Sequence, residues 1–316
     1  MRSRTRLGSL LSMCGMSLLF TVAQAQDWKR AESRDRSAEF VGFLQPDRLY
    51  WRPFTLPNVQ AAEFKQLSFD DKTGARTLLV RLPPGWRQAP GYHTADLEML
   101  VVAGGISIGD RAMGLYSYAY YPAGHAHSFS SEFGATVLQW WSSAPDYIQG
   151  ATSRDGTPKD GVIDGVHYDD VPNGEPSSLP KFRDEPFMEN SPIRTKLLRR
   201  DARTGQMTWI VTTPGGTPAM SGEGKLPLWA SSASWQEGFL LAGDMTIAEC
   251  LPPGQAAGTY APNGYFFRPA GIRHGGLSLY SDTFSIWLFR TGPGHWLTYH
   301  DSCVEPSTPM SGGRAP

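Results

Sequence analysis

The sequence predicts an all-β protein made of two tandem β-barrels of the jelly-roll type, with few short helices. Among its 316 residues are 34 Gly and 25 Pro, and short runs of Val, Ile, Leu, Tyr and Trp lie between them, which is typical of strands joined by turns. No apolar stripe with the period of a helix is sustained over a long window. A stretch of about 110 residues also occurs twice, which predicts two copies of one fold.

The first 25 residues predict a secretory signal peptide. A basic start, MRSRTR, precedes the apolar run LGSLLSMCGMSLLF, and the small-residue signal AQA ends at Ala25. An uncleaved membrane anchor is the alternative, but the apolar run is short and is broken by Gly and Ser. We therefore expect cleavage near Ala25 and a secreted or periplasmic protein with no stable membrane anchor.

The charge of the predicted mature chain argues against nucleic acid as a partner. Cleavage removes three arginines and no acid, so Lys and Arg fall from 29 to 26 against 30 Asp and Glu, a net charge of −4. A mildly acidic chain without a basic run is not typical of nucleic-acid-binding proteins. Cleavage also leaves two cysteines, Cys250 and Cys303, for which a disulfide and two unrelated thiols are both open.

Each copy of the repeat begins with a predicted hairpin. The segments EFKQLSFDDKTGARTLLVRLPPG and RTKLLRRDARTGQMTWIVTTPGG share nine identities at an offset of 131 residues, including Lys65 with Lys196. A Thr-Gly dipeptide in each supplies a residue suited to positive φ between two strands. We expect one barrel over residues 39–150, a connector over 151–190, a second barrel over 191–300 and a disordered tail over 301–316.

The later parts of the two copies match as well. LEMLVVAGGISIGD matches QEGFLLAGDMTIAE, so Glu98 aligns with Glu237, and PAGHAH matches PAGIRH, so His127 aligns with His274. These motifs resemble those of the cupin superfamily, H-x-H-x3-4-E followed by P-x-G-x-x-H. The whole chain resembles a bicupin, in particular the ChrR-type anti-sigma-factor cupins and uncharacterised secreted relatives. The resemblance implies two jelly-roll barrels and a metal site, but no single reaction, because cupins include dioxygenases, isomerases, hydrolases, sensors and seed storage proteins.

The resemblance implies a metal site in the first barrel, formed by His93, Glu98 and His127. The first histidine of the motif is replaced by Gly91. Two imidazoles and one carboxylate are typical of non-haem Fe(II) with open positions, and would also suit Zn²⁺ or Mn²⁺. We expect one divalent metal ion per chain, with Fe(II) favoured; ordinary half-buried polar residues are the alternative. His125, directly after the Pro-x-Gly turn, is expected at the rim of the site rather than as a fourth ligand.

The second barrel is expected to lack a metal. Ser232 takes the place of His93, so that Glu237 and His274 alone remain of the implied ligands. We favour a buried hydrogen bond or salt bridge between them, and leave open a metal-free pocket for a small ligand. In the first barrel, Tyr118 and Tyr120 on one face of a strand predict either the wall of an aromatic pocket or a large aromatic core.

Two classes of function follow from these motifs. The first is an exported metal-dependent enzyme acting on a small molecule, dioxygenase-like rather than hydrolase or isomerase. The second is a non-catalytic cupin that binds or senses a small molecule or a metal. No catalytic base is assigned. Dimerisation through edge strands is a further option for a bicupin.

Overall fold

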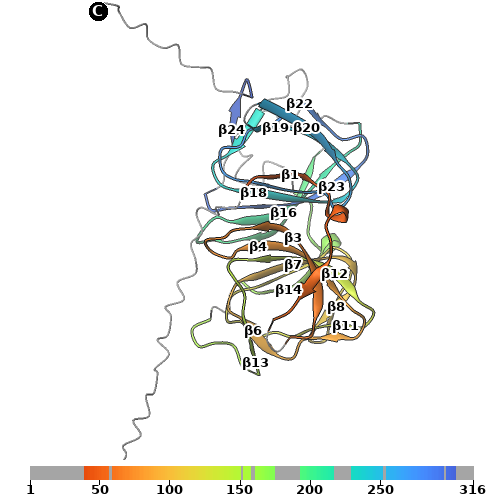
Figure 1. The fold of residues 1–316 in the computed structure, drawn as a ribbon, viewed down its shortest axis with the longest axis vertical. Coiled ribbons are helices and arrows are strands. Elements are labelled where there is room, and N and C mark those ends of the chain that lie inside the picture. The colour runs from red at the N-terminus through yellow and green to blue at the C-terminus, as the bar shows by residue number, and fades with distance from the viewer. Residues whose placement is uncertain are drawn as a thin grey trace, which may run out of the picture. The chain divides into compact units, whose positions relative to one another are not determined.

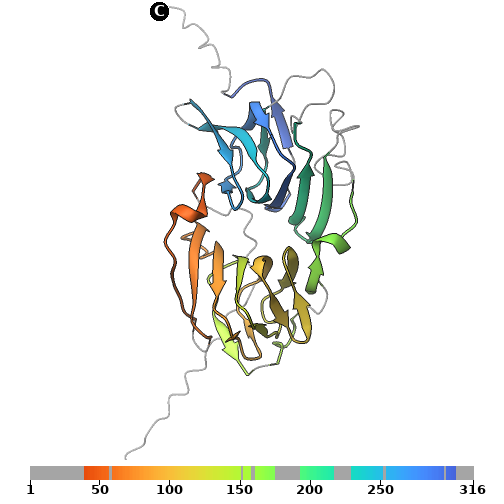
Figure 2. The same cartoon turned by 90° about the vertical axis from the view of Figure 1, so that its right-hand side faces the viewer.

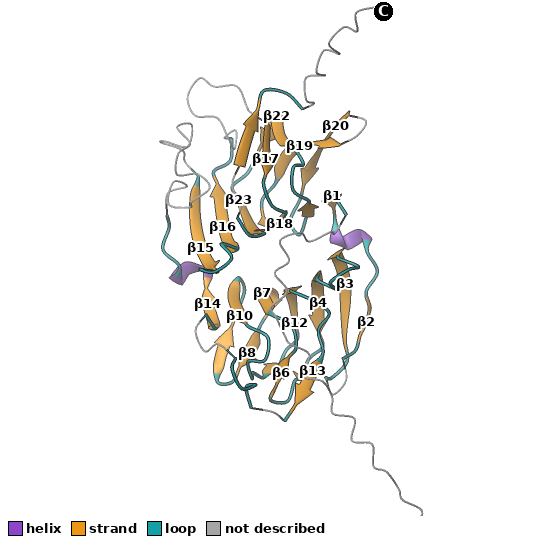
Figure 3. Cartoon of the chain, turned by 90° about the vertical axis from the view of Figure 1, so that its left-hand side faces the viewer, coloured by secondary structure: helices purple, strands orange, loops and turns teal. Residues whose placement is uncertain are grey.

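The computed structural model describes residues 39–56, 59–150, 152–157, 161–174, 193–216, 229–251, 254–294 and 297–303, which all belong to one compact unit beginning at Ala31. The predicted signal peptide and most of the predicted tail lie outside these ranges. The described residues form strands and two short 3₁₀ helices, η1 (Pro46–Arg48) and η2 (Tyr168–Asp170), as Figure 3 shows. This confirms the predicted all-β class. None of the helices in this part of the chain is long and apolar enough to cross a membrane.

The first barrel is built on a seven-stranded antiparallel sheet in the order β14-β10-β7-β12-β4-β3-β2. A four-stranded sheet, β5-β11-β8-β9, and the pair β13-β6 complete it. The strands are β2 (Arg52–Phe54), β3 (Ala62–Phe69), β4 (Arg76–Leu82), β5 (Trp86–Arg87), β6 (Gly91–His93), β7 (Leu97–Gly104), β8 (Ile106–Ile108), β9 (Arg111–Met113), β10 (Ser117–Tyr121), β11 (Phe129–Ser131), β12 (Ala135–Trp141), β13 (Tyr147–Gln149) and β14 (Ile163–His167).

The second barrel has a six-stranded sheet, β1-β21-β18-β23-β16-β15, and a five-stranded sheet, β20-β19-β22-β17-β24. Its strands are β1 (Val41–Leu44), β15 (Arg194–Arg200), β16 (Met207–Thr213), β17 (Trp229–Ser232), β18 (Gln236–Ala242), β19 (Met245–Leu251), β20 (Gly254–Tyr260), β21 (Tyr265–Arg268), β22 (His274–Tyr280), β23 (Ser285–Thr291) and β24 (Leu297–His300). The two barrels therefore repeat one topology, as the internal repeat predicts.

The predicted hairpins at the start of each copy are present. β3 pairs with β4, and β15 pairs with β16, in antiparallel register. Gly74 and Gly205 have φ of 73° and 75°, so each turn uses its glycine for a left-handed backbone. Asp70 and Asp201 close the turns by accepting backbone N–H groups from the residues two and three positions further on.

Two strands lie outside the predicted domain limits. β1 comes from the start of residues 39–150, but it pairs with β21 of the second barrel, with Val41 opposite Phe267. Figure 1 shows this strand, in red, beside the blue strands of that barrel. The Phe43 N–H donates to the Tyr260 hydroxyl at 3.0 Å, and the two rings stack. β14, from the predicted connector, pairs with β10 and extends the first barrel instead.

The seven-stranded and six-stranded sheets face each other and share a core. Along β7, Leu97, Met99 and Val101 point into the first barrel, whereas Leu100 belongs to a separate core together with Phe239 and other second-barrel residues. Figures 1 and 2 show the two sets of strands on either side of this shared layer. The central strands of these sheets are thus buried on both faces, which explains the long apolar runs in β7 (LEMLVVAG) and β18 (QEGFLLA).

The aromatic residues of β10 belong to this shared core. Tyr118 and Tyr120 lie in it, whereas Tyr121 points into the first barrel. Of the two interpretations of this strand, the structure favours the large aromatic core, and Tyr120 also lines a small pocket formed by residues of both barrels. The reason is that the face carrying Tyr118 and Tyr120 is covered by the second barrel.

Candidate functional site

The two predicted histidine ligands meet inside the first barrel. His93 ends β6, and His127 follows the turn after β10; their ring centroids are 5.1 Å apart, and both residues are buried. His127 Nδ1 donates to the His125 carbonyl at 2.8 Å, so that its Nε2 carries the lone pair. That Nε2 is buried and has no hydrogen-bond partner among the described residues. His125 therefore orients His127 through its backbone, consistent with a place outside the ligand set.

Aromatic side chains pack closely around both imidazoles. The His93 ring centroid lies 4.6 Å from that of Trp141 and 4.9 Å from that of Tyr147. Tyr147 also blocks the place of the missing motif histidine, because a Cβ on Gly91 would come within 2.6 Å of the Tyr147 hydroxyl and 2.4 Å of the Ile148 carbonyl oxygen. Burial lowers the pKa of His93 well below its usual value, and lowers that of His127 to about 4. Both rings are therefore neutral at pH 7.

Glu98 does not join the two histidines, so the predicted three-residue site is wrong in this respect. Its neighbours Leu97 and Met99 point into the first barrel, and successive side chains of a strand alternate between faces. Glu98 therefore points toward the second barrel. Its carboxylate accepts hydrogen bonds from the Tyr118 hydroxyl at 2.8 Å and, across the interface, from the Thr208 hydroxyl at 2.6 Å.

Glu237 repeats this arrangement from the second barrel. It accepts from the Tyr265 hydroxyl at 2.7 Å and from the Thr77 hydroxyl of the first barrel at 2.6 Å. Tyr118 aligns with Tyr265 at the offset that relates His127 to His274. Each glutamate therefore accepts one hydrogen bond from a tyrosine of its own barrel and one from a threonine of the other barrel. Glu237 forms this network and an ion pair with Arg290 in place of the predicted hydrogen bond or salt bridge with His274.

Arg290 binds both buried carboxylates. Its Nη2 donates to Glu98 at 2.9 Å, and its Nη1 donates to Glu237. In the second barrel Arg290 lies opposite Glu237 in the sheet, and in the first barrel Trp140 lies opposite Glu98. Arg290 therefore occupies the position that Trp140 has in the first copy, and this one arginine binds the carboxylates of both copies. The guanidinium also lies over the Trp140 ring at 5.0 Å.

A second arginine, Arg199, completes the charges around Glu98. It donates to Glu98 at 3.3 Å and to Asp201 at 3.2 Å. Burial alone would raise the pKa of Glu98, but Arg290 and Arg199 outweigh it and lower the pKa to about 2. Glu98 is thus an ionised residue that joins the two barrels.

The residues present do not fit the implied metal. Glu98 is held by two arginines on the far face of β7, and Gly91 and Tyr147 leave no room for another imidazole. In the part of the chain that the structure describes, no group of three His, Cys, Asp or Glu side chains is placed to hold a metal ion. We therefore derive no reaction step through a metal at these residues.

The second barrel contains a cavity of about 120 Å³. Most of its wall is apolar: Ile193, Val211, Ala230, Met245, Ile247, Tyr260, Phe266, Gly275, Leu279, Trp287, Phe289 and Leu297 line it. Among the described residues, Gln236, Arg268, His274 and Thr213 add polar side chains to this wall. A mainly apolar cavity with a few polar groups on its wall is typical of a small-molecule site.

Arg268 is a charged residue of this wall and is almost fully buried. Its Nε donates to both oxygens of Glu249 at 2.9 Å, and its Nη1 donates to Gln236 Oε1 at 3.2 Å. Glu249 therefore balances its charge inside the barrel. At the equivalent positions of the first barrel, Leu97 aligns with Gln236 and Tyr121 aligns with Arg268, and both belong to the packed core. At these two positions the second barrel therefore has polar side chains where the first barrel has core residues.

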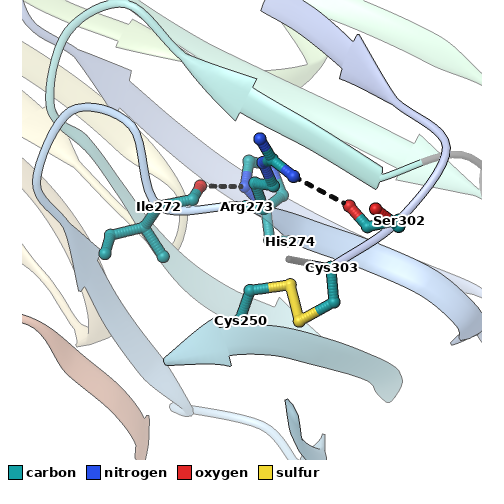
Figure 4. Close-up of a disulfide and its surroundings, with 6 residues drawn as sticks. All are labelled: Cys250, Ile272, Arg273, His274, Ser302 and Cys303. Atoms are coloured by element: carbon teal, nitrogen blue, oxygen red, sulfur yellow. Dashed lines mark hydrogen bonds between the residues drawn. A yellow bond between two sulfur atoms is a disulfide. The ribbon is translucent and has the colours of Figure 1, made fainter. Parts of the chain in front are cut away.

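The two cysteines form a disulfide beside this cavity, shown in Figure 4. Cys250 lies on β19, and Cys303 follows β24, which pairs with β17 through four residues. Arg273 also donates to the Ser302 carbonyl at 3.1 Å. Leu297 of β24 and Ala230 of β17 both line the cavity. The disulfide links β19 to the segment after β24, and so joins two strands on this side of the cavity.

Comparisons with known proteins agree with this architecture. The family model of a domain of unknown function, DUF4437, matches residues 44–293. The chain belongs to the DUF4437 family. No curated protein matches it.

Solved structures place the DUF4437 chain among proteins with the bicupin fold. A "putative dioxygenase" from Nostoc punctiforme is 18% identical, with a TM-score of 0.61 over 81% of this chain and 82% of that one. Oxalate decarboxylase from Lactobacillus farciminis (10% identical, TM-score 0.52, 82% and 88% covered) and a 7S globulin from Momordica charantia (12%, 0.52, 82% and 86%) are similar as well. The likeness shows the fold alone, because named enzymes and a globulin share it.

The position of Glu98 gives a first prediction. Glu98→Gln should destabilise the protein by about 3 kcal/mol at pH 7, because it leaves buried arginine charge without its carboxylate. Ionised Glu98 stabilises the folded state fully above its ordinary pKa of 4.5, and this contribution is lost as the pH falls toward its folded-state pKa of about 2. The gap between wild type and variant in urea unfolding should therefore narrow from pH 7 to pH 3.

Metal analysis on the same proteins separates the two roles of Glu98. The structure predicts that Glu98→Gln leaves the metal content of the purified protein unchanged. If Glu98→Gln is as stable as the wild type but loses a bound metal, Glu98 is a metal ligand after all.

Proposed function

We propose that this protein is a bicupin that binds a small, mainly apolar molecule in the cavity of its second barrel. The observation that carries the proposal is the contrast between the barrels. The first is filled by aromatic packing around His93 and His127, whereas the second keeps about 120 Å³ open behind a short polar wall. Of the two function classes expected from the sequence, the binding protein is better supported, because the dioxygenase-like enzyme required Glu98 beside the histidines.

The disulfide supports the expected export of the protein. Disulfides persist in oxidising compartments and are rare in the cytosol, so a Cys250–Cys303 bond fits a secreted or periplasmic protein. A binding protein in that location would meet small molecules from outside the cell. The finer resemblance to ChrR-type sensors stays a prediction.

Filling the cavity tests the proposal. Ala230 is fully buried, and its side chain lines the cavity, so Ala230→Leu should occupy the space without opening a new one. We expect single-ring and short-chain molecules at 100 times their Kd to stabilise the wild type by about 2.7 kcal/mol. The variant should lose this effect in thermal unfolding.

Ala256→Leu is the matched control, because Ala256 is exposed on β20 of the same sheet. It should bind ligands as the wild type does. Equal binding by wild type and Ala230→Leu would place the site elsewhere, and the proposal would then fail.

A further inference from the structure

The size of the second-barrel cavity limits its occupant. An apolar cavity of about 150 Å³ in another protein holds benzene, and this one measures about 120 Å³. Its aromatic side is formed by Phe266, Trp287 and Phe289, whose ring centroids lie 5.7–5.9 Å apart. The space therefore suits one six-membered ring or a short branched chain.

The polar side of the cavity offers hydrogen-bond donors. A guanidinium has five N–H groups, and the bonds of Arg268 to Glu249 and Gln236 leave one hydrogen on each Nη. Gln236 uses Oε1 to accept from Arg268, and its amide nitrogen makes no hydrogen bond with any described residue. Because both side chains line the cavity, a ligand there would meet donors that need an acceptor.

The charge of this wall selects the kind of acceptor. Glu249 is fully buried and already neutralises Arg268, so the wall presents donors without net positive charge. A carboxylate ligand would add an unbalanced negative charge to an apolar cavity, which is costly. An uncharged carbonyl oxygen would satisfy the donors without this cost.

We propose that the second barrel binds a single-ring or short-chain apolar molecule bearing an uncharged carbonyl group, and that Gln236 and Arg268 recognise the carbonyl oxygen. This inference rests on the proposed function and names the ligand class of that site. Gln236 is the residue that sets specificity, since Arg268 is also tied to Glu249.

A pair of probes of equal shape tests the carbonyl. Cyclohexanone and methylenecyclohexane differ only in a carbonyl oxygen in place of a methylene group. Their Kd values are measured by NMR on the labelled methyl group of Met245, which lines the cavity, in the wild type and in Gln236→Met. Methionine keeps the approximate length of glutamine and removes its whole amide, that is, the N–H donors and the Oε1 that accepts from Arg268. We expect the substitution to weaken cyclohexanone binding about tenfold, the effect of one buried hydrogen bond, without weakening methylenecyclohexane binding.

The other outcomes overturn either this inference or the proposed function. If both probes bind and Gln236→Met changes both Kd values by the same factor, the carbonyl is not recognised, while cavity binding stands. If neither probe binds the wild type, both proposals fail. Ala230→Leu must abolish the binding of both probes; unchanged binding there would show that Met245 reports on another site, and would overturn both.

Discussion

Replacing Arg290 with methionine is expected to destabilise this protein by about 4 kcal/mol. Arg290 is the guanidinium that contacts Glu98 and Glu237 together, and its side chain is only 13% exposed. Methionine would fill part of its volume but would remove the guanidinium that pairs with both buried carboxylates. Removing one partner of a buried ion pair costs about 3–5 kcal/mol, because the remaining charge stays buried.

The measurement is urea unfolding of wild type and variant at pH 7, followed by tryptophan fluorescence and circular dichroism, since agreement of the two probes tests two-state behaviour. Arg290→Lys is the matched control. It retains a positive charge but cannot reach both carboxylates with separate N–H groups, so its free energy of unfolding should lie between those of the wild type and Arg290→Met.

The double variant Arg290→Met with Glu237→Gln should recover part of the loss, because it removes one of the two carboxylates that pair with Arg290. If Arg290→Met proves too unstable to purify, that recovery and the lysine variant still test the idea. A loss below about 1 kcal/mol for Arg290→Met would contradict a central role of this arginine.

The internal repeat predicted the two barrels, because it is visible as identities at constant offsets. The turn glycines and the hairpins follow from local signals, whereas the meeting of His93 with His127 was implied by the resemblance to cupins. The two histidines come together because the His127 backbone forms an antiparallel bridge with Gly91, two residues before His93. Local patterns of this kind are what sequence analysis reads best.

The face of Glu98 could not be predicted in the same way. β7 is buried on both faces, one in the first barrel and the other between the barrels, so its sequence has no alternation of polar and apolar residues to indicate the inward side. Motif spacing was the remaining guide, and it assigned Glu98 to the wrong face. Glu237 recurs at the equivalent position because both carboxylates are needed between the barrels.

Sequence analysis did not identify Arg290 or the polar wall of the second barrel, because these residues differ between the two copies of the repeat. A search for repeated residues finds what the copies share, whereas Arg290 aligns with Trp140 and Arg268 with Tyr121. A charged residue in one copy opposite an aromatic residue in the other is the signal that could have revealed them. β1 is a different case, since four residues carry too little information to choose between two barrels.

Removing the disulfide is the second change with a large expected effect. The double variant Cys250→Ala with Cys303→Ala should lose about 4 kcal/mol, since closed loops of about 15 and 100 residues contribute about 3 and 4.7 kcal/mol in the chain-entropy model. Here the sequence separation is 53 residues. β24 would then remain attached through its pairing with β17 and the bond from Ser231 to His300.

Unfolding with and without dithiothreitol measures this effect. The wild type should fall to the stability of the double variant on reduction, whereas the double variant should not respond. Intact mass of the exported protein is the companion measurement: it should begin at Gln26 and have no free thiol, because Cys14 leaves with the predicted signal peptide. Two free thiols per mature chain would contradict both the bond and its contribution. A stable, fully oxidised protein would instead show that β24, whose Leu297 lines the cavity, is held covalently by the disulfide.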